Sequence, residues 1–391
     1  RLAGLERKKI EDELKAIQEL IESLKALLAN PKKILGVIKD EMKEIKEKFG
    51  DERRTRIMKG GVQVLSVEDL IPDEENALVL TSGGYIKRTN PDEFRRQKRG
   101  GVGVVDLDTK DEDFVTTLLI TSTHSDLLFF TNKGRVYRAK VHELPDAGRD
   151  ARGQHVANLL AFKPDEEIAE VLSIRNYEVA PYLVLATKSG LVKKTDLQEY
   201  DSARVGGLIA ISLKDDDEVI GASLATDKDE LLLVSKKGMS LRFSANNESL
   251  RATGRSTSGV IGMKFRAGDE LLAMARVDSK SDNLFVFTAT DGGFGKKSAL
   301  DEYRLQNRGG IGIKAAKIDE DSRGVLVSAL VISNDDEILA ITSSGTVMRT
   351  DASEVRQTGR DSMGVRLVNL DSGSTLLSVT KNSENADTVS A

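Results

Sequence analysis

A run of seven residues, Gln97–Gly103 (QKRGGVG), has the composition of a loop that holds phosphate. Two neighbouring cations supply positive charge, and three glycines leave backbone N–H groups accessible because glycine carries no side chain. The residues expected to face phosphate are Gln97, Lys98, Arg99, Gly100, Gly101 and Gly103. The phosphate could belong to a nucleotide or to the backbone of a nucleic acid, and a solvated turn is the simplest alternative.

Nucleotide and metal sites are disfavoured by spacing. The segment TDGGFGKKS contains Gly295-Lys296, but Thr290 and Lys297 stand where a P-loop requires a glycine and a hydroxyl residue. The segment GGVG at 100–103 lacks the third glycine of a dinucleotide loop. The three histidines have no zinc spacing, and the chain has no cysteine. We therefore expect no catalytic site, no metal and no cofactor in this chain.

The loop belongs to a sixfold internal repeat. Each copy reads as an apolar strand, a polar turn that ends in glycine, and a second strand with cations; the turn glycines are Gly84, Gly134, Gly190, Gly238, Gly293 and Gly345. A second glycine follows 17 to 21 residues later and opens another strand; these are Gly101, Gly153, Gly207, Gly259, Gly310 and Gly364. A fourth strand closes each copy. The pattern predicts an all-β, six-bladed β-pinwheel or propeller-like array of four-stranded blades.

The regions outside the repeats have a different composition. Apolar residues recur every three or four positions in residues 1–49, with a break at Asn30-Pro31, which predicts a short α-helical coiled-coil segment of two helices. Residues 50–62 are charged and read as a linker, 63–380 as the β array, and 381–391 as a C-terminal tail. The chain opens inside a helical pattern without a methionine, so we expect it to be part of a longer protein.

The overall composition excludes few functions, whereas the distribution of charge along the sequence is more informative. The net charge is −5, no apolar run is long enough to span a membrane, and no signal peptide is visible. Cations nevertheless recur after each turn glycine, namely Lys87, Arg88, Arg135, Arg138, Lys193, Lys194, Arg242, Lys296, Lys297 and Arg349. Arg95, Arg96 and Arg308 add to them in loops. If these residues face outward, they form a curved positive track for duplex DNA; the alternative is a solvated, aggregation-resistant edge.

QKRGGVG resembles the Gln-Arg-Arg-Gly-Gly-Lys-Gly box of the DNA gyrase A family. The segments GLERKKIEDEL, EIKEKFGDERRT, FFTNKGRVYRAK and ARGQHVANLLAF are also similar to that family, so the resemblance covers nearly the whole chain. It implies a six-bladed, DNA-wrapping β-pinwheel after the end of a coiled coil. A second box-like run, QNRGGIG at 306–312, occupies the equivalent place in the fifth repeat.

The resemblance also implies a setting for the chain. The family acts on double-stranded DNA together with gyrase B in the bacterial cytoplasm, on the chromosome, and introduces negative supercoils; ATP and Mg²⁺ are bound by other parts of that enzyme. Its catalytic tyrosine follows an arginine, and none of the six tyrosines here does. The resemblance thus implies a piece that wraps DNA without cutting it.

Two departures weaken the box. Lys98 replaces an arginine and loses its bidentate fork, and Val102 replaces a lysine. Three alternatives remain open at this point. The chain could be the wrapping domain of topoisomerase IV, a non-catalytic propeller scaffold that binds proteins, or a free-standing architectural DNA-binding protein.

Overall fold

The computed structural model describes residues 2–51, 68–91, 113, 115–148, 151–202, 206–214, 216–278, 280–344, 346–370 and 373–381. The chain divides into two compact units, Arg1–Val64 and Leu65–Ala391. The predicted boundaries of the linker at 50–62 and of the tail at 381–391 fall almost wholly outside the described residues.

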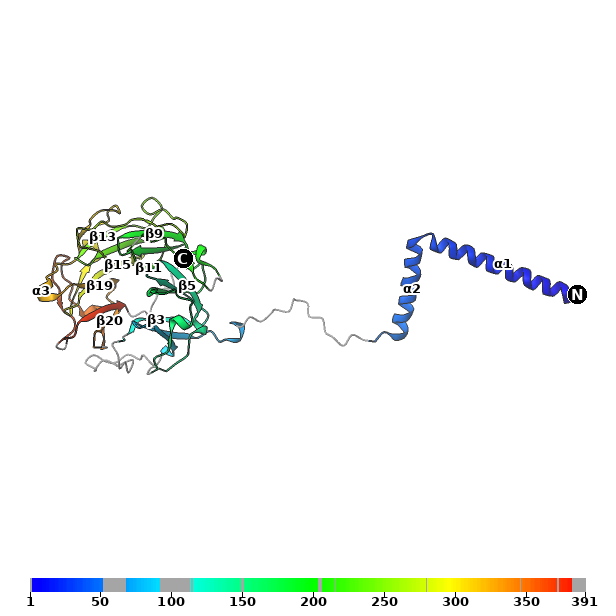
Figure 1. The fold of residues 1–391 in the computed structure, drawn as a ribbon, viewed down its shortest axis with the longest axis horizontal. Helices are drawn as coiled ribbons and strands as arrows, with labels where there is room; N and C mark the ends of the chain where they lie inside the picture. Colours follow the sequence, from blue (N-terminus) through cyan, green and yellow to red (C-terminus); the bar gives the residue numbers. More distant parts are fainter. Residues whose placement is uncertain are drawn as a thin grey trace. The chain divides into compact units, whose positions relative to one another are not determined.

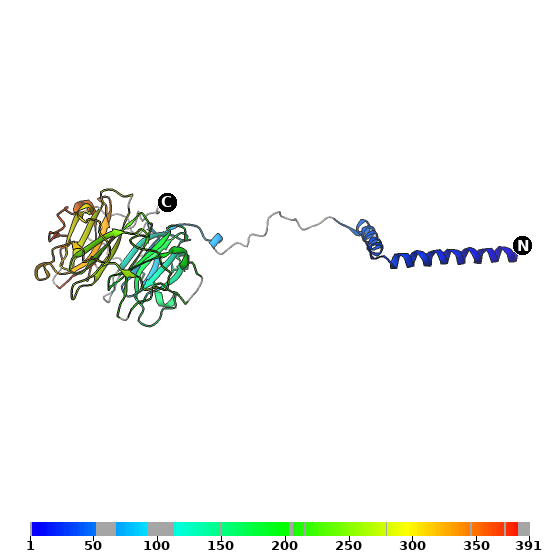
Figure 2. The same cartoon turned by 90° about the horizontal axis from the view of Figure 1, so that it is seen from above.

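The described part of the first unit consists of two helices, α1 (Leu2–Leu28) and α2 (Pro31–Phe49), drawn in blue in Figures 1 and 2. The predicted break between them is confirmed: Asn30 caps α2 by accepting a hydrogen bond from the backbone N–H of Lys32 (3.0 Å), with Pro31 in the first turn. The apolar stripes of both helices are exposed, for example at Leu24 and Met42. None of the described helices combines the length and apolar character needed to span a bilayer.

The second unit is built from six β-hairpins, and the strand bounds follow the predicted repeats. The hairpins are β1 (Glu75–Thr81) with β2 (Tyr85–Thr89), β4 (Asp126–Thr131) with β5 (Arg135–Lys140), β8 (Tyr182–Thr187) with β9 (Leu191–Asp196), β12 (Glu230–Ser235) with β13 (Met239–Ser244), β16 (Phe285–Thr290) with β17 (Phe294–Ala299), and β20 (Glu337–Thr342) with β21 (Val347–Asp351). We number the repeats one to six by these hairpins.

Each repeat adds a long inner strand beside the first strand of its own hairpin. The inner strands are β3 (Val115–Ser122), β7 (Ile168–Ile174), β11 (Val219–Ala225), β15 (Leu271–Val277), β19 (Leu326–Ile332) and β23 (Leu376–Lys381). Contacts join β7 to β11, β11 to β15, β15 to β19 and β19 to β23. In Figure 1, β11 and β15 accordingly lie nearer the centre of the array than β9 and β13.

A fourth, short strand crosses from each of repeats two to six into the preceding one. These exchanged strands are β6 (Gln154–His155), β10 (Leu208–Ile209), β14 (Val260–Ile261), β18 (Ile313–Lys314) and β22 (Val365–Arg366). They pair with β2, β5, β9, β13 and β17 respectively, at the edge of each sheet opposite the inner strand. Five sheets therefore have four strands, and the sixth has three, β21-β20-β23, among the described residues. The predicted six-bladed array with shared strands is confirmed.

A glycine with positive φ precedes each exchanged strand, as at Gly259 (φ 80°) and Gly364 (φ 84°). A Cβ at Gly259 would lie 2.7 Å from the Val192 carbonyl oxygen, so the close approach of the two strands requires glycine. In the fifth repeat this residue is Gly312, and not Gly310 as the repeat alignment predicted. The loop holds three glycines, of which Gly309 (φ 80°) and Gly312 (φ 81°) both have positive φ, and the position of Gly312 directly before β18 identifies it as the one that opens the strand.

Short helical turns complete the array: η1 (Glu68–Leu70), η3 (Val141–Glu143), η4 (Val156–Asn158), η5 (Leu197–Tyr200), η6 (Leu300–Glu302), η7 (Ala352–Glu354) and α3 (Glu320–Arg323). The apolar cores lie between neighbouring repeats. One cluster joins Phe130 of repeat two with Leu183 and Leu185 of repeat three, for example. Hairpin strands are thus covered on both faces, so consecutive residues along them are buried.

Candidate nucleic-acid interface

The fourth residue after every hairpin glycine is a cation, and five of these six cations bond to the next repeat. We call these residues the latch cations; they are Arg88, Arg138, Lys194, Arg242, Lys297 and Arg349. Five of them reach the turn after the following hairpin: Arg88 Nε to Leu144 O (3.1 Å), Arg138 Nη1 to Asp201 Oδ1 (3.3 Å), Lys194 Nζ to Ala245 O (2.7 Å), Arg242 Nη1 to Leu300 O (3.1 Å) and Lys297 Nζ to Ala352 O (2.7 Å). Because the same contact recurs five times, the main role of the latch cations is to hold neighbouring repeats together.

Most latch cations also pair with an acidic or amide side chain of their own repeat. The partners are Asp126 for Arg138 (3.0 Å), Asp227 for Lys194 (2.7 Å), Glu230 for Arg242 (2.5 Å), Asn334 for Lys297 (2.7 Å) and Glu337 for Arg349 (2.8 Å). A charge removed from water needs such partners, because an unpaired buried charge is strongly destabilising. Each of these five cations therefore has a side-chain partner inside the protein.

The third residue after the hairpin glycine is a buried lysine in repeats one, three and five. We call Lys87, Lys193 and Lys296 the loop lysines. Each donates to the loop that precedes the exchanged strand of the next repeat: Lys87 to Gly148 O (3.3 Å), Lys193 to Arg255 O, and Lys296 to Gly359 O (3.3 Å) and Arg360 O. Burial lowers the pKa of Lys193 and of Lys296 to about 8.

The sequence predicted that the cations after the hairpin glycines face outward and form a positive track. This prediction is wrong for five of them. Lys87, Lys193, Lys194, Lys296 and Lys297 are at most 3% exposed. The physical reason is that their strands are covered on both faces, so even the consecutive pair Lys193-Lys194 is buried. A DNA contact stays a prediction for the partly exposed residues, which are Arg88, Arg135, Arg138, Arg242, Arg308 and Arg349.

Outward arginines occur instead in loops between a hairpin and the exchanged strand that follows it, as the structure describes for repeats four to six. We call these segments the rim loops. Arginines stand eight and four residues before the strand-opening glycine in three of them: Arg251 and Arg255, Arg304 and Arg308, Arg356 and Arg360. Arg95 and Arg99 hold the same places before Gly103. The repeat alignment made from the sequence used Gly310 in place of Gly312, which moved the arginines of repeat five two residues out of line with those of repeats four and six. The shared spacing was therefore not visible, and the sequence analysis missed Arg251, Arg255, Arg304, Arg356 and Arg360.

The two arginine positions differ in how they are held. Arg251, Arg304 and Arg356 are exposed, and their side chains have no hydrogen-bond or ion-pair partner among the residues the structure describes. The other position is tethered to the exchanged strand of the preceding repeat: Arg255 Nη1 donates to Ile209 O (2.7 Å), Arg308 Nη1 to Ile261 O (3.0 Å), and Arg360 Nη1 to Lys314 O. Because a guanidinium has five N–H donors, one such bond leaves others for a ligand.

The first box, Gln97–Gly103, lies outside the described residues, as do Arg95 and Arg96. The second box is described. There, Arg308 Nε donates to Ser249 O (2.6 Å), and the backbone N–H of Gly309 donates to Gly262 O (2.6 Å). At least one backbone N–H of this box is thus used inside the fold, which leaves a smaller role for backbone phosphate binding than the glycine count predicts.

Raising the pH above 8 will stabilise the wild-type chain relative to a Lys193→Met/Lys296→Met variant. The pKa of both lysines is about 8 in the fold, against 10.5 in the unfolded chain. Between these values the unfolded state binds more protons, so the free energy of unfolding rises with pH by up to about 1.4 kcal/mol per pH unit for each lysine. Urea denaturation of both proteins at several pH values measures the difference. An identical pH dependence would contradict it.

Comparison with known proteins decides the family. The model of the family described as "DNA gyrase C-terminal domain, beta-propeller" matches six segments, one per repeat: residues 75–122, 125–175, 181–226, 229–278, 285–333 and 336–383. The chain belongs to this gyrase C-terminal domain family.

Relatives agree with that assignment. The chain is 55% identical over 389 residues to the A subunit of DNA gyrase from Streptomyces coelicolor, covering 98% of this chain and 45% of that protein. It is 51% identical over 384 residues to the same subunit of Mycolicibacterium smegmatis gyrase, again with 98% and 45% coverage. This gyrase A domain chain thus spans just under half the length of the curated relatives it matches.

Two solved structures resemble the gyrase domain closely in fold. A gyrase A C-terminal domain aligns with a TM-score of 0.68 and 28% identity, covering 79% of this chain and all (100%) of that one. A topoisomerase IV C-terminal domain aligns with a TM-score of 0.65 and 29% identity, covering 80% and 94%. Fold alone separates the two poorly, and the full-length relatives named as gyrase decide between them.

Proposed function

We propose that this gyrase domain binds duplex DNA without sequence preference and wraps it around its rim loops. The observation that carries the proposal is the periodic set Arg251, Arg304 and Arg356, exposed and without partners among the described residues, at equivalent places in three successive repeats. Phosphates recur along DNA whatever its sequence, so a periodic array of guanidinium groups fits the backbone and carries no base readout. Family membership supports the same function.

Distributed contacts suit the energetics of bending. Smooth bending of 20–30 base pairs by 40–90° costs on the order of 1–6 kcal/mol, so a wrap needs many modest contacts along its path. The rim loops provide one contact region per repeat, and in the first repeat this region contains the box at Gln97–Gly103. The latch cations hold the repeats together in this scheme, and the rim arginines neutralise phosphate.

The wrapped DNA serves a larger enzyme in this proposal. The domain acts as the non-catalytic C-terminal part of an ATP-dependent type II topoisomerase that introduces negative supercoils, in the bacterial cytoplasm on the chromosome. The rest of gyrase A and the whole of gyrase B are its protein partners, and ATP and Mg²⁺ bind in those parts. A topoisomerase IV wrapping domain would also bind DNA. A protein-binding scaffold, in contrast, would have no salt-dependent affinity for DNA, so a DNA-binding measurement tests that alternative.

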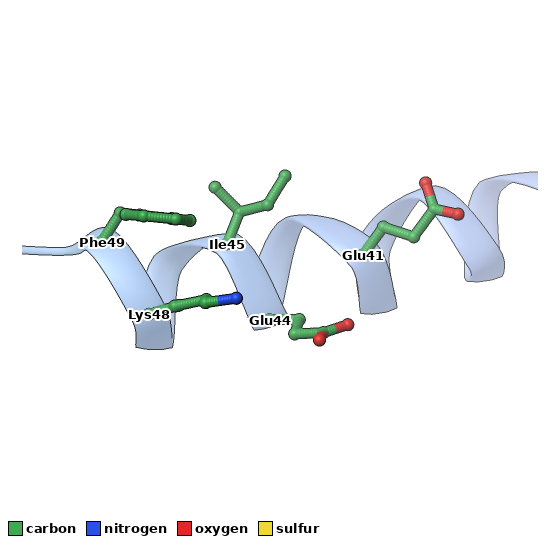
Figure 3. Close-up of a pocket in the computed structure, with 5 residues that line it drawn as sticks. All are labelled: Glu41, Glu44, Ile45, Lys48 and Phe49. Atoms are coloured by element: carbon green, nitrogen blue, oxygen red, sulfur yellow. The ribbon is translucent and has the colours of Figure 1, made fainter.

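The helices of the first unit support a contact with the remainder of gyrase A. Figure 3 shows Ile45 and Phe49 on the same side of α2, with Lys48 and Glu44 directed elsewhere. Phe49 is 73% exposed and Ile45 54%, which is unusual for large apolar side chains that recur along one stripe. These residues line only a shallow surface hollow together with Glu41. We propose that the stripe packs against coiled-coil helices of the same protein.

Relaxing a plasmid in the presence of the chain tests the wrapping proposal. The wild type is expected to leave a shift in linking number after the protein is removed, because wrapped DNA is relaxed with its writhe trapped. Alanine at residues 97–103 is expected to abolish the shift, since the wrap loses its contact at the first repeat, while affinity for a short linear duplex falls only a few-fold. Topoisomer gels and fluorescence anisotropy measure the two quantities.

A variant with alanine at Lys236 and Lys237, on the β12–β13 turn, is the matched control for lost charge and is expected to wrap normally. Equal loss of short-duplex binding and of the linking-number shift in the box variant would make the box an ordinary contact. The absence of any salt-dependent DNA affinity in the wild type would overturn the proposed function and favour the protein-binding scaffold.

A further inference from the structure

The rim loops are of two alternating kinds. Repeats two, four and six contain Gly-Arg followed by three residues and glycine: AGRDARG (147–153), TGRSTSG (253–259) and TGRDSMG (358–364). We call these the Gly-Arg loops. Repeats one, three and five instead contain a pair of glycines: QKRGGVG (97–103), SARVGG (202–207) and QNRGGIG (306–312). The period of the loop sequence is therefore two repeats.

The loop lysines follow the same alternation. Lys87, Lys193 and Lys296 stand before the Gly-Arg loops of repeats two, four and six. The equivalent residues of repeats two, four and six are Tyr137, Leu241 and Met348. Two of those side chains lie against the glycines: Cβ atoms at Gly207 and Gly310 would meet the Tyr137 ring and Leu241 Cδ1. An uncharged side chain thus suffices at this position for the fold, so the ammonium group has another reason to be there.

The Gly-Arg arginines of repeats four and six are fixed at three points. The carbonyl of Arg360 accepts from Lys296, its backbone N–H donates to Glu302 Oε2 (2.7 Å), and its Nη1 donates to Lys314 O. Arg255 repeats the arrangement, with its carbonyl bonded to Lys193, its N–H to Glu199 Oε2 (2.8 Å) and its Nη1 to Ile209 O (2.7 Å). By contrast, Arg308 in the second box is held through its side chain, by the carbonyls of Ser249 and Ile261.

We propose that Lys193 and Lys296 are positioning residues for DNA binding, each holding the Gly-Arg loop of the next repeat so that its arginine meets phosphate in a fixed place. The proposal rests on the proposed function. Both ammonium groups are almost fully buried, and they donate to backbone carbonyls. Burying a charge is costly. The benefit of burying these two ammonium groups is that the loop is already ordered before DNA binds, so less conformational entropy is lost on binding.

A double-mutant cycle between Lys296 and Arg360 tests this role in the full chain. Lys296→Met, which introduces the residue type found at position 348, is expected to lower affinity for a mixed-sequence duplex by roughly threefold to tenfold. The same change is expected to have no further effect in an Arg360→Ala background, because the lysine acts through that arginine. Both single variants should reduce the log–log salt slope by up to about 0.9, the loss of one phosphate contact.

Leu241→Met, at the equivalent place before a di-glycine loop, is the matched control and is expected to leave affinity and salt slope unchanged. Additive losses in the cycle, or a folded Lys296→Met variant with wild-type affinity, would overturn the proposal. If Lys296→Met fails to fold, the Lys193→Met and Arg255→Ala pair gives an independent cycle with the same expected coupling. Wild-type DNA binding without coupling defeats only this inference, whereas a wild type that does not bind DNA defeats the proposed function.

Discussion

Simultaneous replacement of Arg251, Arg304 and Arg356 by alanine will flatten the salt dependence of DNA binding. Each phosphate contact contributes about −0.9 to the slope of log affinity against log salt, so the slope is expected to become less steep by about 2.7. At roughly 1 kcal/mol for each exposed charge-assisted contact, affinity at low salt falls about 100-fold. Titrations of a labelled duplex at several salt concentrations measure both values.

The stability of this triple variant is the internal control. The three side chains make no hydrogen bond or ion pair with the described residues, so the urea midpoint is expected to match that of the wild type. A matched charge control replaces Lys214, Lys264 and Lys317, which are also exposed, with alanine. An equal change of slope in that control would mean that total charge, and not the rim register, determines binding.

Arg242→Met will have its main effect on folding. Arg242 Nε pairs with Glu230 Oε2 at 2.5 Å, and its Nη1 donates to the carbonyls of Leu300 and Tyr303 at 3.1 Å each. Removing the guanidinium leaves the largely buried Glu230 carboxylate without its partner. Loss of one member of a buried pair costs about 3 to 5 kcal/mol. Urea denaturation followed by circular dichroism measures the loss.

The Glu230→Met/Arg242→Met double variant separates the ion pair from the rest of the latch. Replacing both members of a buried pair by apolar residues is often nearly neutral, so the double variant is expected to recover most of the lost stability. Arg251→Met, which changes an exposed arginine of the same repeat, is expected to cost less than about 0.5 kcal/mol. A single variant as stable as wild type would contradict the latch role.

The repeats, the hairpins and the break at Pro31 could be predicted because their signals are local. Glycine spacing, turn residues and apolar alternation lie within a few residues of the structure they specify. Whether a cation faces solvent or the protein interior is not determined by the residues near it in the sequence. Lys193 and Lys194 bond the carbonyls of Arg255 and Ala245, which are 62 and 51 residues away along the chain, and nothing near the lysines indicates that acceptors lie there.

The register of the rim arginines shows a second limit. It depends on which glycine opens the exchanged strand, and in QNRGGIG three glycines compete for that place. Only the positive φ of Gly312 and its position next to β18 identify it. Once Gly312 is chosen, Arg304 and Arg308 align with Arg356 and Arg360. The role of the first box stays a prediction, since its residues lie outside the described part of the chain.

Because of the exchanged strands, the sheets are completed one after another in the order in which the chain is synthesised. β6, β10, β14, β18 and β22 each complete a sheet that began one repeat earlier. On the ribosome, a sheet such as β15-β12-β13-β18 therefore keeps an open edge until the next hairpin and its rim loop have been synthesised. At about 5–20 residues per second, one repeat takes several seconds. During that interval the edge of β13 can pair with any strand nearby, so nascent chains of this architecture are most exposed to mispairing between neighbours on one polysome.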